Sequence, residues 1–148
     1  MSGVVYFLYK IARALYLAHI PLLPRLIKLF IRVTFACSLP YTAKIGENTI
    51  LGYGGLGIVI HSDSIIGKNC IISQGVTIGG SSRNPKIPEI GNNVLVGAGA
   101  KIIGPIKIAD NVVIGANSVV TKDVPSNVLV AGIPARVIKE NININDYL

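Results

Sequence analysis

The chain has 148 residues, a length that suits one domain with a short appendage. Hydrophobic residues make up 51% and charged residues 14% of the sequence, a balance that excludes intrinsic disorder. Two cysteines and two histidines exclude a disulfide scaffold and a four-cysteine zinc site, and a three-histidine metal centre would need ligands from a second chain. The net charge of +7 indicates an anionic partner without saying which kind.

Residues 1–40 predict an N-terminal amphipathic helical segment. Apolar residues recur at helical spacing over residues 4–18. Pro21 and Pro24 then interrupt the pattern, and Pro24 suits the first turn of a second helix over residues 24–36. The apolar stripes of the two helices are Val4, Phe7, Leu8, Ile11, Leu15 and Ala18, and Leu26, Leu29, Phe30 and Val33.

Two interpretations of this segment are compatible with each other. In the first, the hairpin is a cap packed on the main domain. In the second, its basic residues Arg25, Lys28 and Arg32 also bring it to an anionic membrane surface, at the inner face of the membrane.

The start of the chain lacks the charged residues of a signal peptide, and no uncharged stretch of about 18 residues precedes Pro40. We therefore expect a cytoplasmic protein without a membrane-spanning helix. In such a reducing compartment, Cys37 and Cys70 should be free thiols, with Cys70 pointing inward and inert.

A six-residue period begins at residue 60. Its positions are Ile60, Ile66, Ile72, Ile78, Asn84, Ile90, Val96, Ile102, Ile108, Ile114 and Val120. Ten of these eleven are Ile or Val, against 39 such residues among all 148, which chance does not explain. Glycine follows at positions 67, 79, 91, 97 and 115, and a mostly small or β-branched residue comes four positions after the aliphatic one.

The period predicts an all-β solenoid, because six residues make one short strand and one turn, and three such units close a triangular coil. The aliphatic side chains should stack inside, with glycine in the turns because it tolerates positive φ. We expect this domain over residues 41–139, with roughly five coils between 43 and 134 and a register shift of three at Tyr53–Gly57. The tail 140–148 is either a last strand or a frayed end.

One unit breaks the period. Positions 79–89 read GGSSRNPKIPE, where Asn84 replaces the aliphatic residue and Pro85 and Pro88 oppose strand pairing. We interpret this segment as a loop that leaves the coil. A loop held by a rigid scaffold is a common place for function.

These residues resemble the hexapeptide-repeat acyltransferases, and among them the serine acetyltransferase branch. The motifs that carry the resemblance are Gly57–Ile60, Gln74–Gly80, Pro85–Ile87, Val96–Ile102 and Ala131–Arg136. The resemblance covers about residues 43–139, two-thirds of the chain. It implies a left-handed parallel β-helix of hexapeptide repeats, a homotrimer without nucleic acid or metal, and acetyl-CoA as the donor, bound in the groove between neighbouring subunits.

The resemblance also implies a set of CoA-binding residues. They are Gly79, Gly80, Ala98, Ala116, Thr121, Lys122, Arg136 and Lys139. Small residues let the pantetheine arm approach the backbone, while Lys and Arg meet the phosphates. Taken alone, the alanines would indicate tight coil packing and the basic residues a solvated surface.

The chain departs from the family where serine acetyltransferases carry their histidines. An Asp-His pair is replaced by Gly52-Tyr53, and a second histidine is replaced by Asn84. Arg83 does match, and with Asn84 it is expected to face the acceptor. Because neither family histidine is present, these departures favour an acceptor other than free serine.

Acetyl transfer to a hydroxyl needs a base that removes the hydroxyl proton. His61 is the histidine of the repeat, where its position should face outward, and we predict that it is this base. Asp63 or Glu47 would orient its imidazole, and Tyr53 is the second candidate for acid–base work. His19, in the helical hairpin, is expected to be structural.

The sequence thus predicts an acetyl-CoA-dependent O-acetyltransferase whose acceptor is a sugar hydroxyl of a surface-polysaccharide precursor. The alternative is a serine O-acetyltransferase of cysteine biosynthesis. A β-helical enzyme of the carbonic anhydrase type would need three histidines for each zinc, more than His61 supplies. A non-catalytic scaffold would leave the 79–89 loop and the Arg136 motif without explanation.

Overall fold

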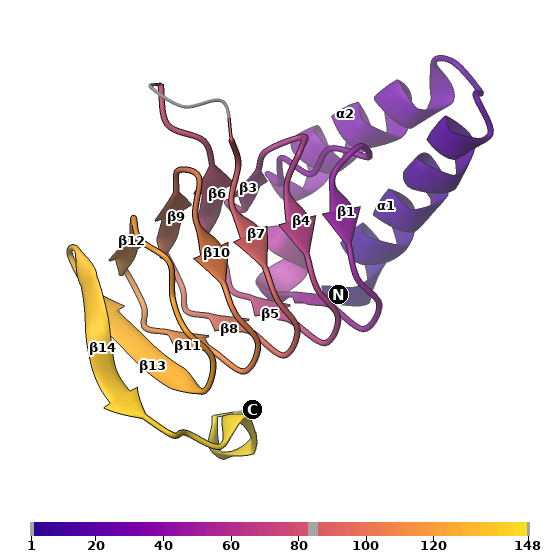
Figure 1. The fold of residues 1–148 in the computed structure, drawn as a ribbon. Coiled ribbons are helices and arrows are strands. Elements are labelled where there is room, and N and C mark those ends of the chain that lie inside the picture. Colours follow the sequence, from indigo (N-terminus) through magenta and orange to yellow (C-terminus); the bar gives the residue numbers. More distant parts are fainter. Residues whose placement is uncertain (1, 83–85, 148) are drawn as a thin grey trace.

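Two helices cover one end of a β-solenoid (Figure 1). The structure, a computed structural model, describes residues 2–82 and 86–147. The helices are α1 (Ser2–Leu17) and α2 (Leu23–Phe35), whose bounds agree with the predicted ones to within two residues. Within the described residues, neither helix is long and apolar enough to cross a bilayer.

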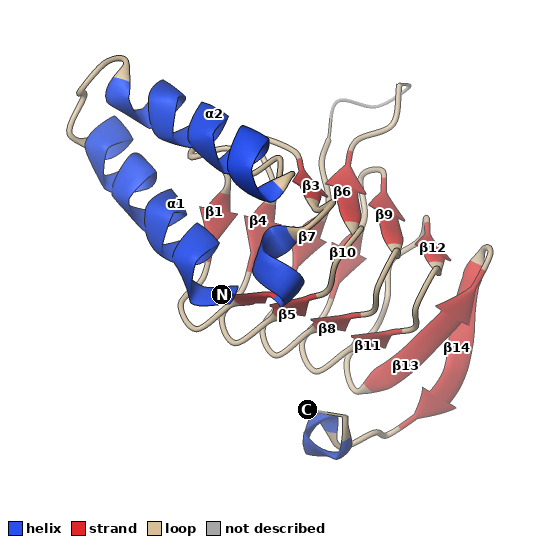
Figure 2. Ribbon diagram, turned by 180° about the vertical axis from the view of Figure 1, so that it is seen from behind, coloured by secondary structure: helices blue, strands red, loops and turns tan. Residues whose placement is uncertain are grey.

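Short strands make up the solenoid, and three of them form each coil (Figure 2). Ten of the first twelve have two residues, because each six-residue unit must also supply a turn. Their bounds are β1 (Lys44–Ile45), β2 (Ile50–Leu51), β3 (Val59–Ile60), β4 (Ile65–Ile66), β5 (Ile71–Ile72), β6 (Thr77–Gly79), β7 (Glu89–Ile90), β8 (Leu95–Val96), β9 (Lys101–Ile103), β10 (Lys107–Ile108), β11 (Val113–Ile114), β12 (Val119–Val120), β13 (Val128–Gly132) and β14 (Ala135–Glu140).

The three faces of the solenoid are three sheets, with strand orders β1-β4-β7-β10, β2-β5-β8-β11-β13-β14 and β3-β6-β9-β12. Their pairing is parallel, except between β13 and β14. Paired residues are 18 positions apart in sequence where the period is undisturbed, as in Ile90 and Ile108. The separation rises to 21 between Ile45 and Ile66, across the predicted register shift, and to 24 between Ile66 and Ile90, across the predicted loop.

Four coils are complete, and a fifth stops after its second strand. Val124 makes a bridge to Ile108, and β13 pairs with β11, as a fifth coil requires. The chain then reverses at Gly132–Pro134 into the antiparallel β14, so no third strand follows. The prediction of roughly five coils was therefore slightly too high.

The predicted interior is confirmed. All ten aliphatic residues of the period are at most 3% exposed. Cys37 and Cys70 are buried free thiols, as expected, and desolvation by burial raises the pKa of both, to about 12 for Cys37. A raised pKa keeps a thiol protonated, and the thiol is then a poor nucleophile.

The prediction that glycine occupies left-handed turns is confirmed at Gly57, Gly75 and Gly99, with φ angles of 68° to 71°, but it was wrong for the repeat glycines at 67, 79, 91, 97 and 115. On another edge, positive φ angles occur at Asn48, Asn69, Asn93, Asn111 and Asn127, with values of 53° to 59°. Asparagine tolerates this conformation better than other residues with a Cβ. Each of the first four side chains also donates to the next one across the coils, so the series runs from Asn48 to Asn127 with nitrogen–oxygen distances of 3.0 to 3.2 Å. This asparagine ladder holds one edge of the solenoid together.

The repeat glycines are required by close approach between coils. A Cβ on Gly46 would lie 2.5 Å from the carbonyl carbon of Gly67 in the next coil, and one on Gly67 would collide with the backbone of Gly91. Gly79 differs, because an added Cβ there meets nothing within 4 Å.

The helical hairpin is a cap on the first coil, as the first interpretation expected, but it packs through other residues than the predicted stripes. Val5, Tyr9 and Ala12 of α1 and Ile31 of α2 are buried, whereas Val4, Phe7 and Ile11 and all four residues of the second stripe are exposed. The predicted stripes therefore face mainly away from the core.

Hydrogen bonds to the edge of the first coil explain which face packs. The Tyr9 hydroxyl donates to the Ala43 carbonyl at 2.6 Å, and the Tyr6 hydroxyl donates to the Gly46 carbonyl at 2.8 Å. Arg13 donates to the carbonyls of residues 41, 42 and 43 at 3.1 to 3.2 Å. An edge strand presents unpaired backbone groups, and these side chains satisfy them.

A pair of alanine substitutions tests the close-approach argument. Gly46→Ala should lower the free energy of unfolding by about 1–3 kcal/mol, because its Cβ overlaps the backbone of the next coil. Gly79→Ala should change it by less than about 1 kcal/mol. Chemical denaturation at one protein concentration measures both, and equal losses in the two variants would contradict the argument.

Candidate functional site

One edge of the solenoid gathers several predicted site residues. The turns that follow β3, β6 and β12 stack along this edge, and they carry His61, the start of the 79–89 loop, and Thr121 with Lys122. Figure 1 shows the described parts of this loop, residues 80–82 and 86–88, extending beyond β6 and β7. The predictions for Arg83 and Asn84 lie outside the described residues.

His61 faces outward, as predicted. Its backbone N–H donates to the Ile78 carbonyl of the next coil at 2.9 Å, which fixes the start of the turn. Its side chain is 41% exposed, and its Nδ1 lies 3.9 Å from a carboxylate oxygen of Asp63. Glu47 instead pairs with Lys68 at 3.8 Å. Of the two acids predicted to orient His61, the structure brings Asp63 to the imidazole.

The imidazole in this position can act as a base after a small rearrangement. Nδ1 accepts a hydrogen bond from the backbone N–H of Asp63 at 3.2 Å, so the neutral ring carries its proton on Nε2. Nε2 can accept a proton only when the neutral ring carries its own proton on Nδ1. The Nδ1–H group would then donate a hydrogen bond to the Asp63 carboxylate. Catalytic hydrogen bonds often tighten in this way when substrate binds.

Tyr53 lies at the other end of β3 from His61. It belongs to a short 3₁₀ segment, Gly52–Gly55, where its φ is 50°, and its side chain is 81% exposed. This segment connects the second sheet to the third, whereas His61 starts the turn from the third sheet to the first. The structure therefore does not place the two acid–base candidates on one edge.

The predicted CoA residues fall on both sides of the sheet β3-β6-β9-β12. Ala98 and Ala116 follow β8 and β11 and lie in the turns that lead into this sheet. Gly79, Gly80, Thr121 and Lys122 lie at or beyond its other edge. Lys101, at the start of β9, lies on the sheet between these two groups, and the sequence analysis did not include it. Its position directly before the inward-facing Ile102 indicates that its side chain faces outward. Its ammonium donates to the Gly75 carbonyl at 2.6 Å.

Lys122 and Arg136 share a hollow of about 250 Å³ near the C-terminal end of the solenoid. Asp123, Pro125 and Val137 are also in its wall. Lys139 is exposed on β14, the strand that also carries Arg136. Two cations beside apolar side chains suit a ligand that carries phosphates on an organic body.

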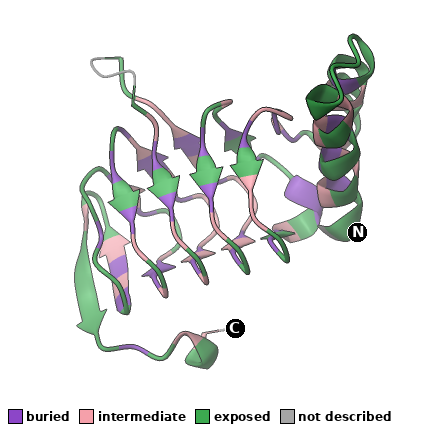
Figure 3. Cartoon of the chain, turned by 45° about the vertical axis from the view of Figure 1, so that its right-hand side comes forward, coloured by how far each residue is buried: buried purple, intermediate pink, exposed green. Residues whose placement is uncertain are grey.

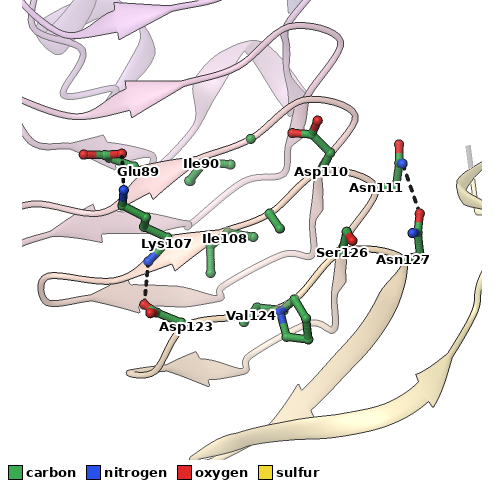
Figure 4. A pocket seen from close by; sticks show the side chains of 13 residues that line it. Glu89, Ile90, Lys107, Ile108, Asp110, Asn111, Asp123, Val124, Ser126 and Asn127 are labelled. Atoms are coloured by element: carbon green, nitrogen blue, oxygen red, sulfur yellow. Dashed lines mark hydrogen bonds and ion pairs between the residues drawn. The ribbon is translucent and has the colours of Figure 1, made fainter.

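A larger depression, of about 870 Å³, shares the lining residues Asp123, Val124 and Pro125 with this hollow (Figure 4). Its charged residues are Glu89, Asp110 and Asp123 against Lys107 alone. Lys107 already pairs with Glu89 at 3.6 Å, and its backbone N–H donates to Asp123 at 2.8 Å. An excess of carboxylates repels phosphates, so the smaller hollow suits a phosphate-bearing ligand better than this depression does.

His19 lies two residues after the end of α1, with a φ of 58°, beside backbone hydrogen bonds that close the last helical turn. The structural role expected for it stays a prediction. Among the described residues, no three His, Cys, Asp or Glu side chains come together as a set of metal ligands.

Comparisons with known proteins point to one group. The family model "Bacterial transferase hexapeptide (six repeats)" matches residues 88–122. A serine acetyltransferase of Synechococcus elongatus is 42% identical over 132 residues, which are 88% of this chain and 54% of that protein. The chain carries the hexapeptide repeat and is similar to serine acetyltransferases.

Solved structures of serine acetyltransferases have the same fold. One in complex with CoA superposes with a TM-score of 0.82 at 34% identity, over 93% of this chain and 57% of the other. The soybean enzyme complexed with serine gives a TM-score of 0.82 at 33% identity, over 90% of this chain and 56% of the other. The left-handed β-helix with a helical hairpin is thereby confirmed. This hexapeptide-repeat protein spans about half the length of these relatives.

Proposed function

We propose that this chain is an acetyl-CoA-dependent O-acetyltransferase. The observation that carries the proposal is its similarity, over 93% of its length, to a serine acetyltransferase solved with CoA. The hollow that joins Lys122 and Arg136 supports it, because the phosphates of CoA need cationic partners. Acetyl-CoA is the donor substrate in this proposal, and the chain works as a homotrimer.

In the proposed reaction, the acceptor hydroxyl loses its proton to Nε2 of His61 as its oxygen attacks the thioester carbonyl. Backbone N–H groups can stabilise the resulting oxyanion. The carbon–sulfur bond then breaks, and the imidazolium returns the proton to the CoA thiolate. Asp63 stabilises the imidazolium, since its carboxylate lies 3.9 Å from Nδ1.

Serine is the acceptor that the comparisons favour over the sugar hydroxyl expected from the sequence. The relatives are named serine acetyltransferase, and one was solved with serine. A sugar hydroxyl is the second candidate, because Gly52 and Tyr53 stand where the resemblance would place an Asp-His pair. Tyr53 is 81% exposed and can contact a larger acceptor.

The role of His61 is tested by His61→Ala. This variant should lose about 10²–10⁴-fold in kcat, since general-base catalysis contributes that much, and should keep its fold and CoA affinity. Thiol release from acetyl-CoA measures the rate, and circular dichroism measures the fold. Asp63→Asn should also slow the reaction, whereas Glu47→Gln, a matched loss of one carboxylate, should not. Near-normal turnover of His61→Ala with its proper acceptor would exclude His61 as the base.

The acceptor is identified by the same thiol-release assay across serine, nucleotide sugars and lipid-linked glycans. The proposal predicts that serine gives the highest kcat/KM. A glycan that exceeds serine would establish the second candidate instead. If none of the three classes accelerates thiol release above the rate of hydrolysis, the proposed activity is wrong.

A further inference from the structure

The outer face of the helical hairpin is apolar and uncovered in this chain. Its exposed side chains on α1 include Phe7, at 58%, and on α2 Val33, at 77%. The apolar residues that make up this outer face are Val4, Phe7, Ile11, Leu17, Leu26, Leu29, Phe30 and Val33, all at least 37% exposed. A soluble surface rarely gathers so many large apolar residues unless it binds something.

Helical geometry places these residues on one surface. Because each residue advances about 100° around a helix, Phe7 and Ile11 lie roughly opposite the buried Val5 and Tyr9 on α1. Leu29 and Val33 lie roughly opposite the buried Ile31 on α2 by the same count. Figure 3 shows the two helices as one layer at the end of the solenoid, with exposed residues along it.

The charge of this part of the chain is one-sided. Six of the 14 basic residues, and none of the seven acidic residues, lie within residues 1–46, so this third of the chain supplies six of the seven net positive charges. Arg25, Lys28 and Arg32 line a hollow of about 370 Å³ together with Leu29 and Tyr41. On α2 these cations lie between the buried face and the exposed apolar stripe.

We propose that the outer face of this hairpin binds an anionic lipid bilayer. An apolar stripe bordered by cations is the pattern of a helix that lies in the membrane interface, where apolar side chains enter the acyl boundary and cations meet headgroup phosphates. A second copy of the hairpin is a poorer occupant, because two faces without any carboxylate would repel each other.

Membrane binding through the hairpin would also orient the proposed active site, a consequence that rests on the proposed function. The first coil lies against the hairpin, and it contains β3 and the following His61. Lys122 and Arg136 lie toward the far end of the solenoid. Bound in this way, the protein turns its base toward the bilayer and its nucleotide hollow toward the aqueous phase.

Vesicle co-sedimentation of the full chain tests the proposal without using its activity. The probes are vesicles of phosphatidylcholine with or without phosphatidylglycerol, at about 0.1 M salt. Binding should need the anionic lipid and should weaken as salt screens the charges. Lys28→Gln with Arg32→Gln should lower the partition coefficient about 30-fold, at about 1 kcal/mol for each cation near the surface. Phe30→Ser with Val33→Ser should also weaken binding.

Lys107→Gln with Lys139→Gln is the matched control, because it removes two exposed cations on β10 and β14, in the part of the solenoid far from the hairpin, and should leave binding within about twofold. Circular dichroism and sedimentation velocity confirm that each variant keeps its fold and assembly. Equal weakening by the control pair, or no binding to anionic vesicles, would overturn the proposal. So would a larger assembly in the absence of lipid that Phe30→Ser with Val33→Ser breaks, since a second copy would then cover the face.

Discussion

The structure depends on the close stacking of successive coils. Each coil brings its backbone so near the next that several repeat positions have no room for a Cβ, as Gly46 and Gly67 show. The same stacking aligns Asn69, Asn93 and Asn111 so that each amide reaches the next. Aliphatic side chains then fill the interior as one continuous column. Steric exclusion, side-chain hydrogen bonds and burial therefore all require the same spacing between coils.

This stacking also orders the site. Turns that follow equivalent strands must lie on one edge, which is how His61 and Lys122 come to share an edge although 61 residues separate them in sequence. β3 and β12 are three coils apart, roughly 14 Å at the usual spacing of about 4.8 Å between strands. The proposed base and the proposed site for the CoA phosphates, arranged in this way, suit an extended donor that lies along the solenoid. The helical hairpin packs on one end of this column, against the first coil.

The repeat was predictable from the sequence because aliphatic residues recur at every sixth position. Its two interruptions appear in the structure as paired residues that are 21 and 24 positions apart in sequence. The packed face of the hairpin was not predictable from apolar spacing. Tyr9 and Arg13 decide it through hydrogen bonds to the carbonyls of residues 41–43, a signal that a count of apolar residues cannot detect. The left-handed turns were predicted to contain glycine because glycine tolerates positive φ. On one edge these turns contain asparagine instead, whose side chain also forms hydrogen bonds between coils.

The candidate site residues likewise include some that the sequence could predict and some that it could not. Sequence motifs identified Lys122 and Arg136, and the structure brings them to one hollow. Sequence could not choose between Asp63 and Glu47, since the choice depends on which carboxylate the turn after β3 turns toward the imidazole. The reversal at Gly132–Pro134, which carries Arg136 back beside Lys122, likewise has no trace in the six-residue period.

Calorimetric titration with CoA measures whether this solenoid holds the donor at its C-terminal end, as proposed. We expect saturable binding that Lys122→Gln and Arg136→Gln each weaken about 10-fold or more, since each substitution removes a charge-assisted hydrogen bond to phosphate. Lys107→Gln, in the larger depression, should leave it unchanged. Absence of binding heat, or a loss in Lys107→Gln that equals the loss in Arg136→Gln, would contradict the account.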